Sequence, residues 1–451
     1  MSTARIGVVG GGLAGMAAAL CASDAGADVV IFEQRSVLGG LTSSIRRNGL
    51  SFDNGQHVFM RCCSAYREFI ERIGATSQVY LQRRLEVPVL APGGRCASIK
   101  RTALPAPAHV AMSLARYRHV SLRDRLRLVR PALALKKLDL SDPSLDKISF
   151  GQWLARYGQS EAALARVWNL IALPTLNVPA GEASLALVAK VFRTGMLDRV
   201  DAGDMGWSKI PLGELHGGFG GRALSAAGVE LALGGRVTSI EQVAGGTVVI
   251  GSGERQEVVD ALVVATPPKQ AAKLGAFGGD PDRLGTSPIV NVHIVWDRRV
   301  TDLALAACVE SPIQFVFDHT AAAGLRSGQC LTISLSAADA YLHQGSSQLV
   351  AIFVEAVREM FAPAANARVL DALVTREKAA TFRAVPGTGP LRPGARTAIP
   401  GVFLAGAWCD TGWPATMEGA VASGRRAASE AMDFISGTAV HDCRYVEGVR
   451  R

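Results

Sequence analysis

Three glycines near the start of the chain have the spacing of a phosphate-binding turn. Gly10, Gly12 and Gly15 follow the apolar run Arg5–Val9 and lead into an alanine-rich segment. At such positions the first glycine makes the turn, the second lets the backbone approach a pyrophosphate, and the third lets the next helix lie close to the strand. The helix N-terminus directs N–H groups at the phosphates. The spacing therefore predicts a dinucleotide site.

An acidic residue narrows the choice of dinucleotide. Glu33 ends a second apolar run, Asp28–Phe32, where its carboxylate can accept hydrogen bonds from ribose hydroxyls. An acid there disfavours a 2′-phosphate, so these residues favour FAD or NAD over NADP. We expect Leu13–Ala25 to be the helix between the two strands, which makes a βαβ unit at the start of an α/β fold.

Length and composition indicate a large protein of two or three domains. The chain has 451 residues, 49% of them apolar. No uninterrupted apolar run reaches the roughly 18 to 20 residues that a membrane-spanning helix needs. The first apolar stretch contains the glycine turn and lacks the basic start and cleavage site of a signal peptide. We therefore expect a cytoplasmic protein.

Cysteine usage and net charge limit the classes of function. The eight cysteines are scattered without a CxxC pair, which argues against a zinc site or a disulfide framework and predicts no metal centre. The net charge is +9. A basic protein can bind nucleic acid, an anionic substrate or an anionic membrane surface, and the location of the charge decides among these.

The charge is concentrated in residues 109–138, which predict a basic amphipathic helical region. Four apolar residues fall on one helical face, with Ser121 as N-cap and Pro131 as a kink: Leu122, Leu126, Val129 and Leu133. Eight basic residues stand against one acid, Asp124: Arg116, Arg118, Arg123, Arg125, Arg127, Arg130, Lys136 and Lys137. Such a helix either lies in a membrane interface or is an ordinary surface helix whose arginine stems cover its neighbours. Nucleic acid is disfavoured, because no aromatic platform or recognised module accompanies the charge.

Other elements follow from turn and cap signals. Residues 42–47 and 50–52 predict a hairpin closed by Asn48 and Gly49, and residues 87–99 predict another. We expect a helix over 64–73 with Ser64 as its N-cap, a loop over 174–179, and a helix over 181–197. Residues 229–240 read as one strand, and further strands are expected within 260–265, 289–295, 313–317, 330–335, 369–374 and 401–406.

Several longer segments resemble one flavoprotein family. The chain is similar to the squalene-associated FAD-dependent desaturases, understood as hydroxysqualene dehydroxylases and related to phytoene desaturases. The segments that carry the resemblance are EQRSVLGG at 33–40, FDNGQHV at 52–58, LIALPTLNVP at 170–179, DMGWSKIPLGEL at 204–215, SPIVNVHIVWDRRV at 287–300, REKAATF at 376–382 and DTGWPATMEGAVASG at 410–424.

The resemblance implies an architecture. It is an α/β fold with a Rossmann-type FAD-binding domain of the amine-oxidase and phytoene-desaturase kind and an inserted mixed α+β substrate domain. The FAD-binding domain would comprise residues 1–85, 213–271 and 395–438, and the substrate domain residues 86–212 and 272–394. Residues 439–451 would form a tail.

The resemblance also implies a reaction, the reduction of hydroxysqualene to squalene by reduced FAD in squalene and hopanoid synthesis. The hydroxyl is allylic, so an acid that protonates it would let an allyl cation form, which hydride from flavin N5 would quench. The implied partners are a lipophilic isoprenoid, an unidentified electron donor and other squalene-synthesis enzymes. The basic region 109–138, for its part, predicts peripheral binding to the cytoplasmic face of the inner membrane.

The family pattern assigns FAD-binding positions along the chain. The implied residues are Gly10, Gly12, Gly15, Glu33, Gln34, Arg35, Gly39, Gly40, Gly55, Gln56, His57, Val237, Gly406, Ala407, Thr416 and Met417. Two residues depart from the pattern: Ala407 stands where the family usually has an acid, and Leu41 where relatives commonly have arginine. We expect a weaker or more exchangeable flavin, unless Arg46 or another residue substitutes.

The general acid has several candidates on the same resemblance: Asp53, His57 and Asp410, with Asp204 as a further one. Asp53 could equally cap a turn, and His57 could be a packing residue. Trp413 is expected to form a wall of the isoalloxazine site. Trp207 and Trp168 either line a lipid channel or belong to the core.

Three alternatives remain. A carotenoid-type desaturase would use the same fold to oxidise a polyene. An amine oxidase is weaker, because nothing suggests the aromatic cage that amines favour. A prenyl-binding escort protein without redox activity is disfavoured by the intact glycine turn and Glu33.

Overall fold

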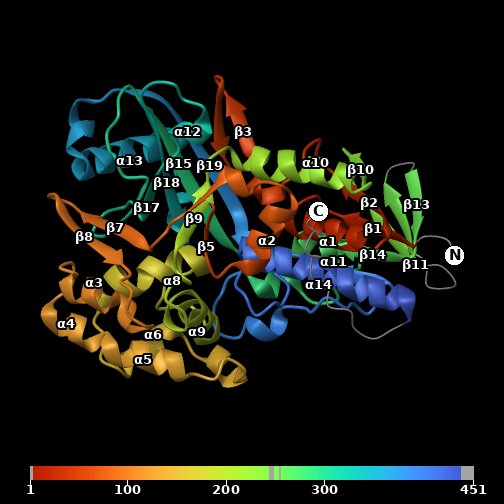
Figure 1. Cartoon of the computed structure of the whole chain (residues 1–451), viewed down its shortest axis with the longest axis horizontal. Helices are drawn as coiled ribbons and strands as arrows, with labels where there is room; N and C mark the ends of the chain where they lie inside the picture. Colours follow the sequence, from red (N-terminus) through yellow and green to blue (C-terminus); the bar gives the residue numbers. More distant parts are fainter. Residues whose placement is uncertain (1–3, 243–247, 253–254, 438–451) are drawn as a thin grey trace.

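A five-stranded parallel sheet forms the first domain. The computed structural model describes residues 4–242, 248–252 and 255–437, so the predicted tail 439–451 lies outside the described residues. The strand order is β10-β2-β1-β14-β20 (Figure 1), with β1 Arg5–Val9, β2 Asp28–Glu33, β10 Glu230–Leu233, β14 Ala261–Val264 and β20 Val402–Leu404. The predicted βαβ unit is confirmed, and the sheet gathers the three segments assigned to the FAD-binding domain.

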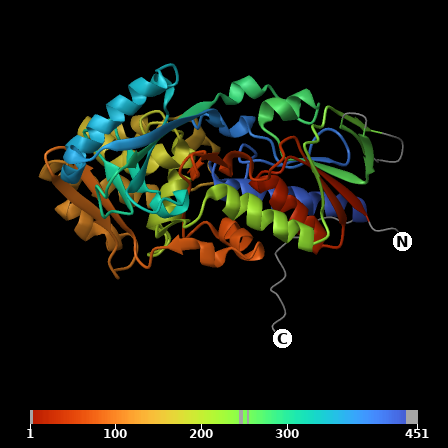
Figure 2. The ribbon, with the colours of Figure 1, turned by 90° about the horizontal axis from the view of Figure 1, so that it is seen from above.

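Two long helices pack tightly in this domain. α1 (Leu13–Asp24) follows the glycine turn, and α14 (Met417–Ser436) is the last described helix. A Cβ on Gly424 of α14 would lie 2.0 Å from the carbonyl oxygen of Ala14, so only glycine permits this approach. The bounds of α14 confirm the predicted helix after Pro414. α10 (Phe219–Ala226) and α2 (Ser64–Arg72) complete this region (Figure 2).

The predicted strand over 229–240 is wrong, because the chain turns away after β10. Gly234 has φ +75°, and the N–H groups of Gly234 and Gly235 donate to the carbonyl oxygens of Arg35 and Glu33. The chain then enters a three-stranded antiparallel sheet of β11 (Ser239–Gln242), β12 (Val248–Ser252) and β13 (Arg255–Val259). The turn leaves residues 234–238 beside the end of β2.

A seven-stranded mixed sheet forms one part of the second domain. Its order is β19-β15-β18-β17-β16-β7-β8, with β7 Glu86–Ala91, β8 Arg95–Lys100, β15 Ser287–Trp296, β16 Leu305–Cys308, β17 Phe315–Asp318, β18 Gln329–Ser336 and β19 Val369–Thr381. The parallel pair β16–β7 joins the two sequence segments predicted to make the substrate domain. Helix α13 (Ser346–Met360) packs on the sheet through Leu349, Phe353 and Val357. The predicted hairpin over 87–99 is confirmed.

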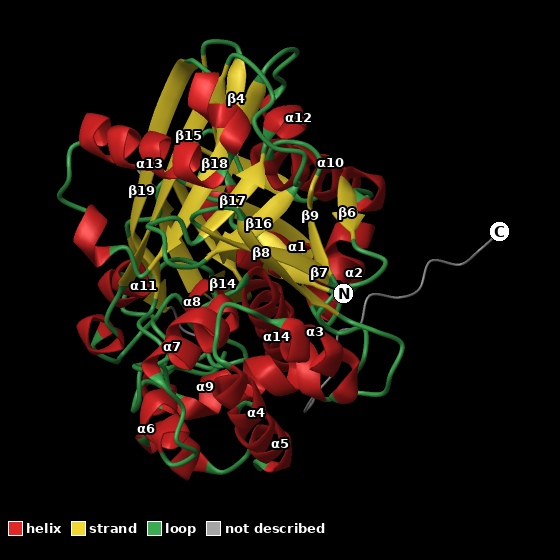
Figure 3. Ribbon diagram, turned by 90° about the vertical axis from the view of Figure 1, so that its left-hand side faces the viewer, coloured by secondary structure: helices red, strands yellow, loops and turns green. Residues whose placement is uncertain are grey.

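A helical layer forms the other part of this domain, below the sheet in Figure 3. It contains α3 Ala111–Arg116, α4 Leu122–Arg127, α5 Val129–Lys137, α6 Phe150–Ala155, α7 Glu161–Ala163, α8 Asn169–Leu176 and α9 Leu185–Phe192. The predicted loop over 174–179 is wrong at its start, because α8 continues through Pro174. Asn177, at φ +54°, ends the helix by donating its N–H to the Leu173 carbonyl.

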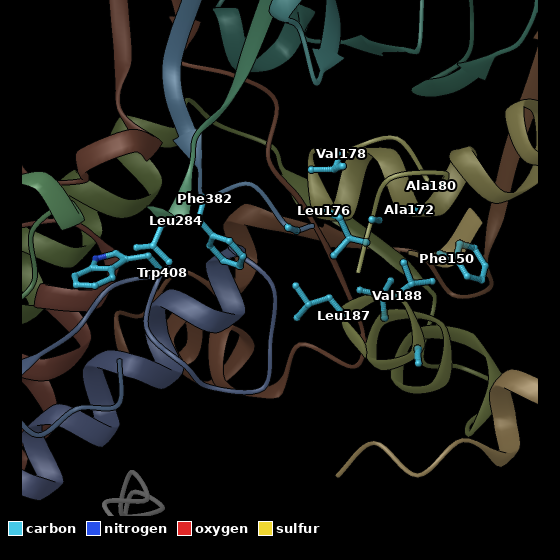
Figure 4. Packing of buried hydrophobic residues seen from close by; sticks show 14 of the residues in the cluster. Phe150, Ala172, Leu176, Val178, Ala180, Leu187, Val188, Leu284, Phe382 and Trp408 are labelled. Carbon is cyan, nitrogen blue, oxygen red and sulfur yellow. The ribbon is translucent and has the colours of Figure 1, made fainter. Parts of the chain in front are cut away.

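One hydrophobic cluster continues between the two domains. Figure 4 shows it running from Trp408 and Phe382 to Leu176, Leu187 and Phe150 of the helical layer. Phe150 also contacts Trp168, whose ring is 4% exposed. Trp168 therefore belongs to the core rather than to a channel wall.

A small sheet takes its strands from both sides of the predicted domain boundary. β9 (Met205–Ser208) pairs with both β5 (Val58–Met60) and β6 (Val79–Leu81). Residues 205–208 were assigned to the substrate domain, but their partners lie in the segment assigned to the FAD-binding domain. The boundary before residue 213 stays a prediction, and the pairing of these distant strands is not visible in their local pattern.

Local turn and cap predictions are partly confirmed. β3 (Ser44–Arg47) and β4 (Leu50–Asp53) form the expected hairpin, with Asn48 and Gly49 at positive φ. Ser64 is the first residue of α2 and makes no side-chain cap, so that prediction is wrong. Ser121 does cap α4, by accepting from the Asp124 N–H. In the described part of the chain, no helix is long and apolar enough to cross a membrane.

Candidate functional site

The glycine turn forms a cradle of open backbone. Gly10 has φ +108°, and a Cβ on Gly15 would lie 1.8 Å from the Gly10 carbonyl oxygen, so both positions require glycine. A Cβ on Gly12 would meet only the Cα of Gly40, at 3.9 Å. The space above Gly12 is therefore free for a ligand, as the role predicted for this glycine demands.

The second glycine pair lies directly beside this turn. The N–H of Gly39 donates to the Gly11 carbonyl at 2.8 Å, and Gly12 and Gly39 form a parallel bridge. The guanidinium of Arg35 donates to the Gly40 carbonyl at 3.3 Å. A cation thus stands next to the predicted pyrophosphate position, where it can offset the missing arginine at Leu41. The structure leaves the Gln34 side chain exposed.

Glu33 is held in place by two backbone donors. Its Oε2 accepts from the Gly11 N–H at 2.7 Å, and its Oε1 accepts from the Arg35 N–H at 2.9 Å. Each carboxylate oxygen keeps capacity for a further donor, such as a ribose hydroxyl. Val237 lies buried in the segment that turns past the end of β2. The residues predicted to bind the adenosine half of FAD therefore lie close together.

The loop between β20 and α14 forms a further part of the predicted dinucleotide site. Gly406 has φ +146°, and a Cβ there would lie 2.5 Å from Nε1 of Trp408. That nitrogen donates to the Thr266 carbonyl at 3.0 Å, while the Thr266 hydroxyl oxygen is buried with no hydrogen-bond partner. Thr416 caps α14 by accepting from the Gly419 N–H. The open cradle, the unpartnered hydroxyl and the helix N-terminus together fit a bound dinucleotide.

Trp413 is anchored beside the start of α14. Its carbonyl accepts from the buried Arg392 at 2.7 Å, and Nζ of Lys190 lies 4.9 Å from its ring centroid. The Lys190 side chain thus connects α9 of the helical layer with the Trp413 ring. Lys190 and Arg392 carried no recognisable signal in the sequence, because both contacts depend on how the domains meet.

Asp53 is a buried carboxyl group at the end of β4. Its Oδ1 accepts from the Ser44 hydroxyl at 2.5 Å and from the Leu212 N–H at 2.9 Å. Its Oδ2 lies 3.5 Å from Nε2 of His319. The pKa of Asp53 is raised, because burial opposes the charged form more strongly than His319, Ser44 and the Leu212 N–H favour it. Asp53 is thus suited to hold a proton.

Three histidines that the sequence reasoning did not single out lie around Asp53 and His57. His293 makes an edge-to-face contact with Phe52 and has its ring centroid 6.3 Å from that of His319. His216 and His57 interact electrostatically, and burial lowers the pKa of His216 and of His293 to about 3. Burial also lowers the pKa of His57. We call Asp53 and these four histidines the Asp53 cluster. Among the described residues, no three His, Cys, Asp or Glu side chains converge as metal ligands.

The Asp53 cluster borders the cradle. The next residue after His216 is Gly217, whose backbone nitrogen would lie 3.8 Å from a Cβ on Gly39. On the other side, a Cβ on Gly55 would lie 3.3 Å from the amide nitrogen of Asn291, a residue of β15. The buried side-chain amide oxygens of Gln56 (Oε1) and Asn291 (Oδ1) have no hydrogen-bond partner. The cluster therefore links the predicted pyrophosphate loop to the substrate-domain sheet.

Two candidate acids lie elsewhere. Asp204 receives hydrogen bonds from Arg61, Arg101 and the Leu85 N–H. Although burial opposes its charge, these donors lower its pKa, so it remains a carboxylate and cannot serve as an acid. The Asp410 side chain is 58% exposed and accepts from the Gly412 N–H within a turn. Trp207 packs against the exposed Tyr80 at a centroid distance of 4.6 Å.

A groove opens between α8 and the strands β16 and β17. Its volume is 370 Å³, and its apolar lining includes Leu170, Leu173, Ile313 and Phe315. A larger hollow of 640 Å³ lies between α13 and β19. The lining of the groove also includes the polar residues Arg166, Asn169 and Glu310, so only its apolar part suits a segment of a hydrocarbon chain.

Comparison with known proteins identifies the family. The profile of the flavin-containing amine oxidoreductases matches residues 13–432. The chain belongs to this family. Its fold and its FAD cofactor are those of an amine-oxidase-like flavoprotein, in agreement with the cradle. The family is one of oxidoreductases, which leaves the escort-protein alternative without support.

Curated relatives within this flavoprotein family fall into two groups. The hydroxysqualene dehydroxylase of Zymomonas mobilis is 26% identical over 94% of this chain and 98% of the relative. That of Rhodopseudomonas palustris is 27% identical over 93% of this chain and 96% of the relative. The zeta-carotene desaturase of Synechocystis sp. is 24% identical over 94% and 96%, respectively.

Solved structures share the fold at lower identity. A putrescine oxidase matches with a TM-score of 0.71 and 16% identity, over 96% of this chain and 99% of the other. The cyclohexylamine oxidase of Brevibacterium oxydans matches with a TM-score of 0.70 and 17% identity, over 96% and 100%. These likenesses concern the fold, and the reaction has to be argued from the site.

Proposed function

We propose that this flavoprotein reduces hydroxysqualene to squalene. The observation that carries the proposal is Asp53, a buried carboxyl with a raised pKa at the border between the cradle and the substrate domain. Removal of an allylic hydroxyl needs a proton donor, whereas desaturation of a polyene does not. Relatives named hydroxysqualene dehydroxylase cover nearly the whole chain and add support.

The proposed reaction breaks one C–O bond and forms one C–H bond. The proton of Asp53 goes to the hydroxyl oxygen, which leaves as water, and His319 stands 3.5 Å from Oδ2 to stabilise the carboxylate that remains. Reduced FAD, when bound, supplies the hydride that goes to the allylic carbon. The apolar side chains grouped beside Asp53, those of Phe52, Val295 and Cys330, would keep water away from the cation.

An anaerobic single turnover tests this proposal. The protein is loaded with FAD, reduced with dithionite and mixed with hydroxysqualene, while flavin absorbance is followed and the lipid is extracted. We expect flavin oxidation with an equal amount of squalene formed. Unchanged flavin and unchanged hydroxysqualene would contradict the proposal.

A carotenoid-type desaturase is the second candidate, because zeta-carotene desaturases match the chain at similar identity and coverage. That reaction runs in the opposite direction, from oxidised flavin to reduced flavin. Anaerobic mixing of the oxidised protein with zeta-carotene distinguishes the two. Bleaching of the flavin there, without turnover of hydroxysqualene, would favour the desaturase.

A further inference from the structure

Helices α4 and α5 expose an apolar stripe to solvent. Leu122, Leu126, Val129 and Leu133 are 64%, 68%, 55% and 46% exposed. Their spacing of four, three and four residues places them on one side of the helical region. On the opposite side Leu128 and Leu135, seven residues apart, are buried in the core.

Ordinary surface helices present charged or polar residues to water, whereas this side presents a row of apolar residues. Met112 of α3 and Leu104, in the segment before it, are also about half exposed. Lys136 donates to the Ala106 carbonyl, so the segment near Leu104 is tied to α5. Figure 3 shows α4 and α5 at the lower edge of the molecule, away from the seven-stranded sheet.

Unpaired positive charge accompanies the stripe. Five basic residues of this region are exposed and form no ion pair within the part of the chain that the structure describes: Arg116, Arg118, Arg123, Arg130 and Lys137. The region's one acid, Asp124, is engaged by the Ser121 hydroxyl at 2.6 Å. The surface thus combines exposed leucines with uncompensated cations.

We propose that α3–α5 dock the protein on an anionic lipid bilayer, with the stripe inserted among the acyl chains and the cations on the headgroups. Apolar insertion flanked by cations is what an interfacial helix uses. A second copy of this chain is a poor occupant, because the two faces would bring like charges together. An anionic bilayer complements both the charge and the apolar stripe.

The position of this face agrees with delivery of a lipophilic molecule, a point that rests on the proposed function. Arg166 lines the 370 Å³ groove and donates to the carbonyl of His119, between α3 and α4. The Tyr117 hydroxyl donates to the Arg166 carbonyl at 2.6 Å. The groove therefore lies beside the segment that joins α3 and α4, the two helices at the start of the proposed docking face.

Vesicle flotation of the FAD-loaded full chain tests the proposal without any substrate. Vesicles of phosphatidylcholine with about 30% phosphatidylglycerol should carry the protein upward, and pure phosphatidylcholine much less. We expect the double variant Leu122→Ser/Leu126→Ser and the double variant Arg123→Glu/Arg130→Glu each to lower the partition coefficient about tenfold. Matched controls elsewhere on the surface, Leu370→Ser and Arg326→Glu, should bind like the wild type.

Two results would overturn the docking proposal. One is wild-type protein that does not float with anionic vesicles. The other is binding that the serine variant retains and only the glutamate variant loses, because it would show a purely electrostatic surface suited to an acidic partner. The variants' thermal unfolding verifies that they fold. Their turnover of detergent-dispersed hydroxysqualene is measured separately, so failure of the proposed reaction leaves the flotation result interpretable.

Discussion

At the residue scale, Asp53 is the carboxyl group whose surroundings best suit a proton donor. The variant Asp53→Asn keeps a similar shape but cannot donate a carboxylic proton, so we expect the single-turnover rate to fall by a factor of about 10² to 10⁴. Because burial raises the pKa of Asp53, the wild-type rate should hold at low pH and fall as pH rises through that pKa. Rapid-mixing measurements across pH would show this fall of the rate, which the asparagine variant should lack.

His319 supplies a separate test of the same cluster. His319 lowers the pKa of Asp53, so His319→Gln should raise that pKa and move the fall of the rate to higher pH. If His319 had only a structural role, its replacement would change the rate without changing the pH at which the rate falls. Asp410→Asn, in an exposed turn, is the matched control and should leave the rate within about twofold. Undiminished turnover by Asp53→Asn would reject Asp53 as the acid.

At the element scale, Glu418 ties α14 to α2. It lies in the first turn of α14, is 3% exposed, and accepts from the N–H groups of Ala65 and Tyr66 at 3.2 and 2.8 Å. Glu418→Ala leaves both donors unsatisfied, so we expect the free energy of unfolding to fall by about 1–3 kcal/mol. Urea titration measures the change. Glu418→Gln retains one acceptor oxygen, so its free energy of unfolding should fall less. The exposed control Glu355→Ala should lose almost none. Equal free energies of unfolding for all three variants would show that Glu418 does not cap α2.

At the scale of the whole molecule, the predicted FAD cradle joins segments that lie far apart in the sequence. The cradle combines Gly12, Gly40, Thr266 and Gly406, so binding should stabilise the fold by about 2.7 kcal/mol at 100 times the Kd. Gly12→Ala should abolish this gain while leaving the apoprotein's Tm unchanged, because φ at Gly12 is −79° and the added Cβ meets open space. Gly278→Ala, also in open space, is the control. Calorimetry with and without FAD checks this, and a full thermal shift in Gly12→Ala would contradict it.

The sequence by itself determined the elements whose signals are local. The glycine turn, Glu33, the Asn48-Gly49 hairpin and the Ser121 cap were predictable, because φ constraints and neighbouring donors act over a few residues. The FAD-binding positions were assigned from a family pattern, and they stay predictions. The FAD affinity expected from Ala407 and Leu41 remains a prediction, although Arg35 beside Gly40 offers a substitute cation.

The tertiary structure alone decided how distant segments meet. The pairing of β9 with β5 and β6, and the approach of His293 and His319 to Asp53, depend on strand register over long separations, which local periodicity does not encode. The same holds for the stripe on α4 and α5. Helical periodicity defined the Leu122 face, but only the packed fold showed that Leu128 and Leu135 face the core while Leu122 and Leu126 remain in solvent, because burial depends on what the rest of the chain covers.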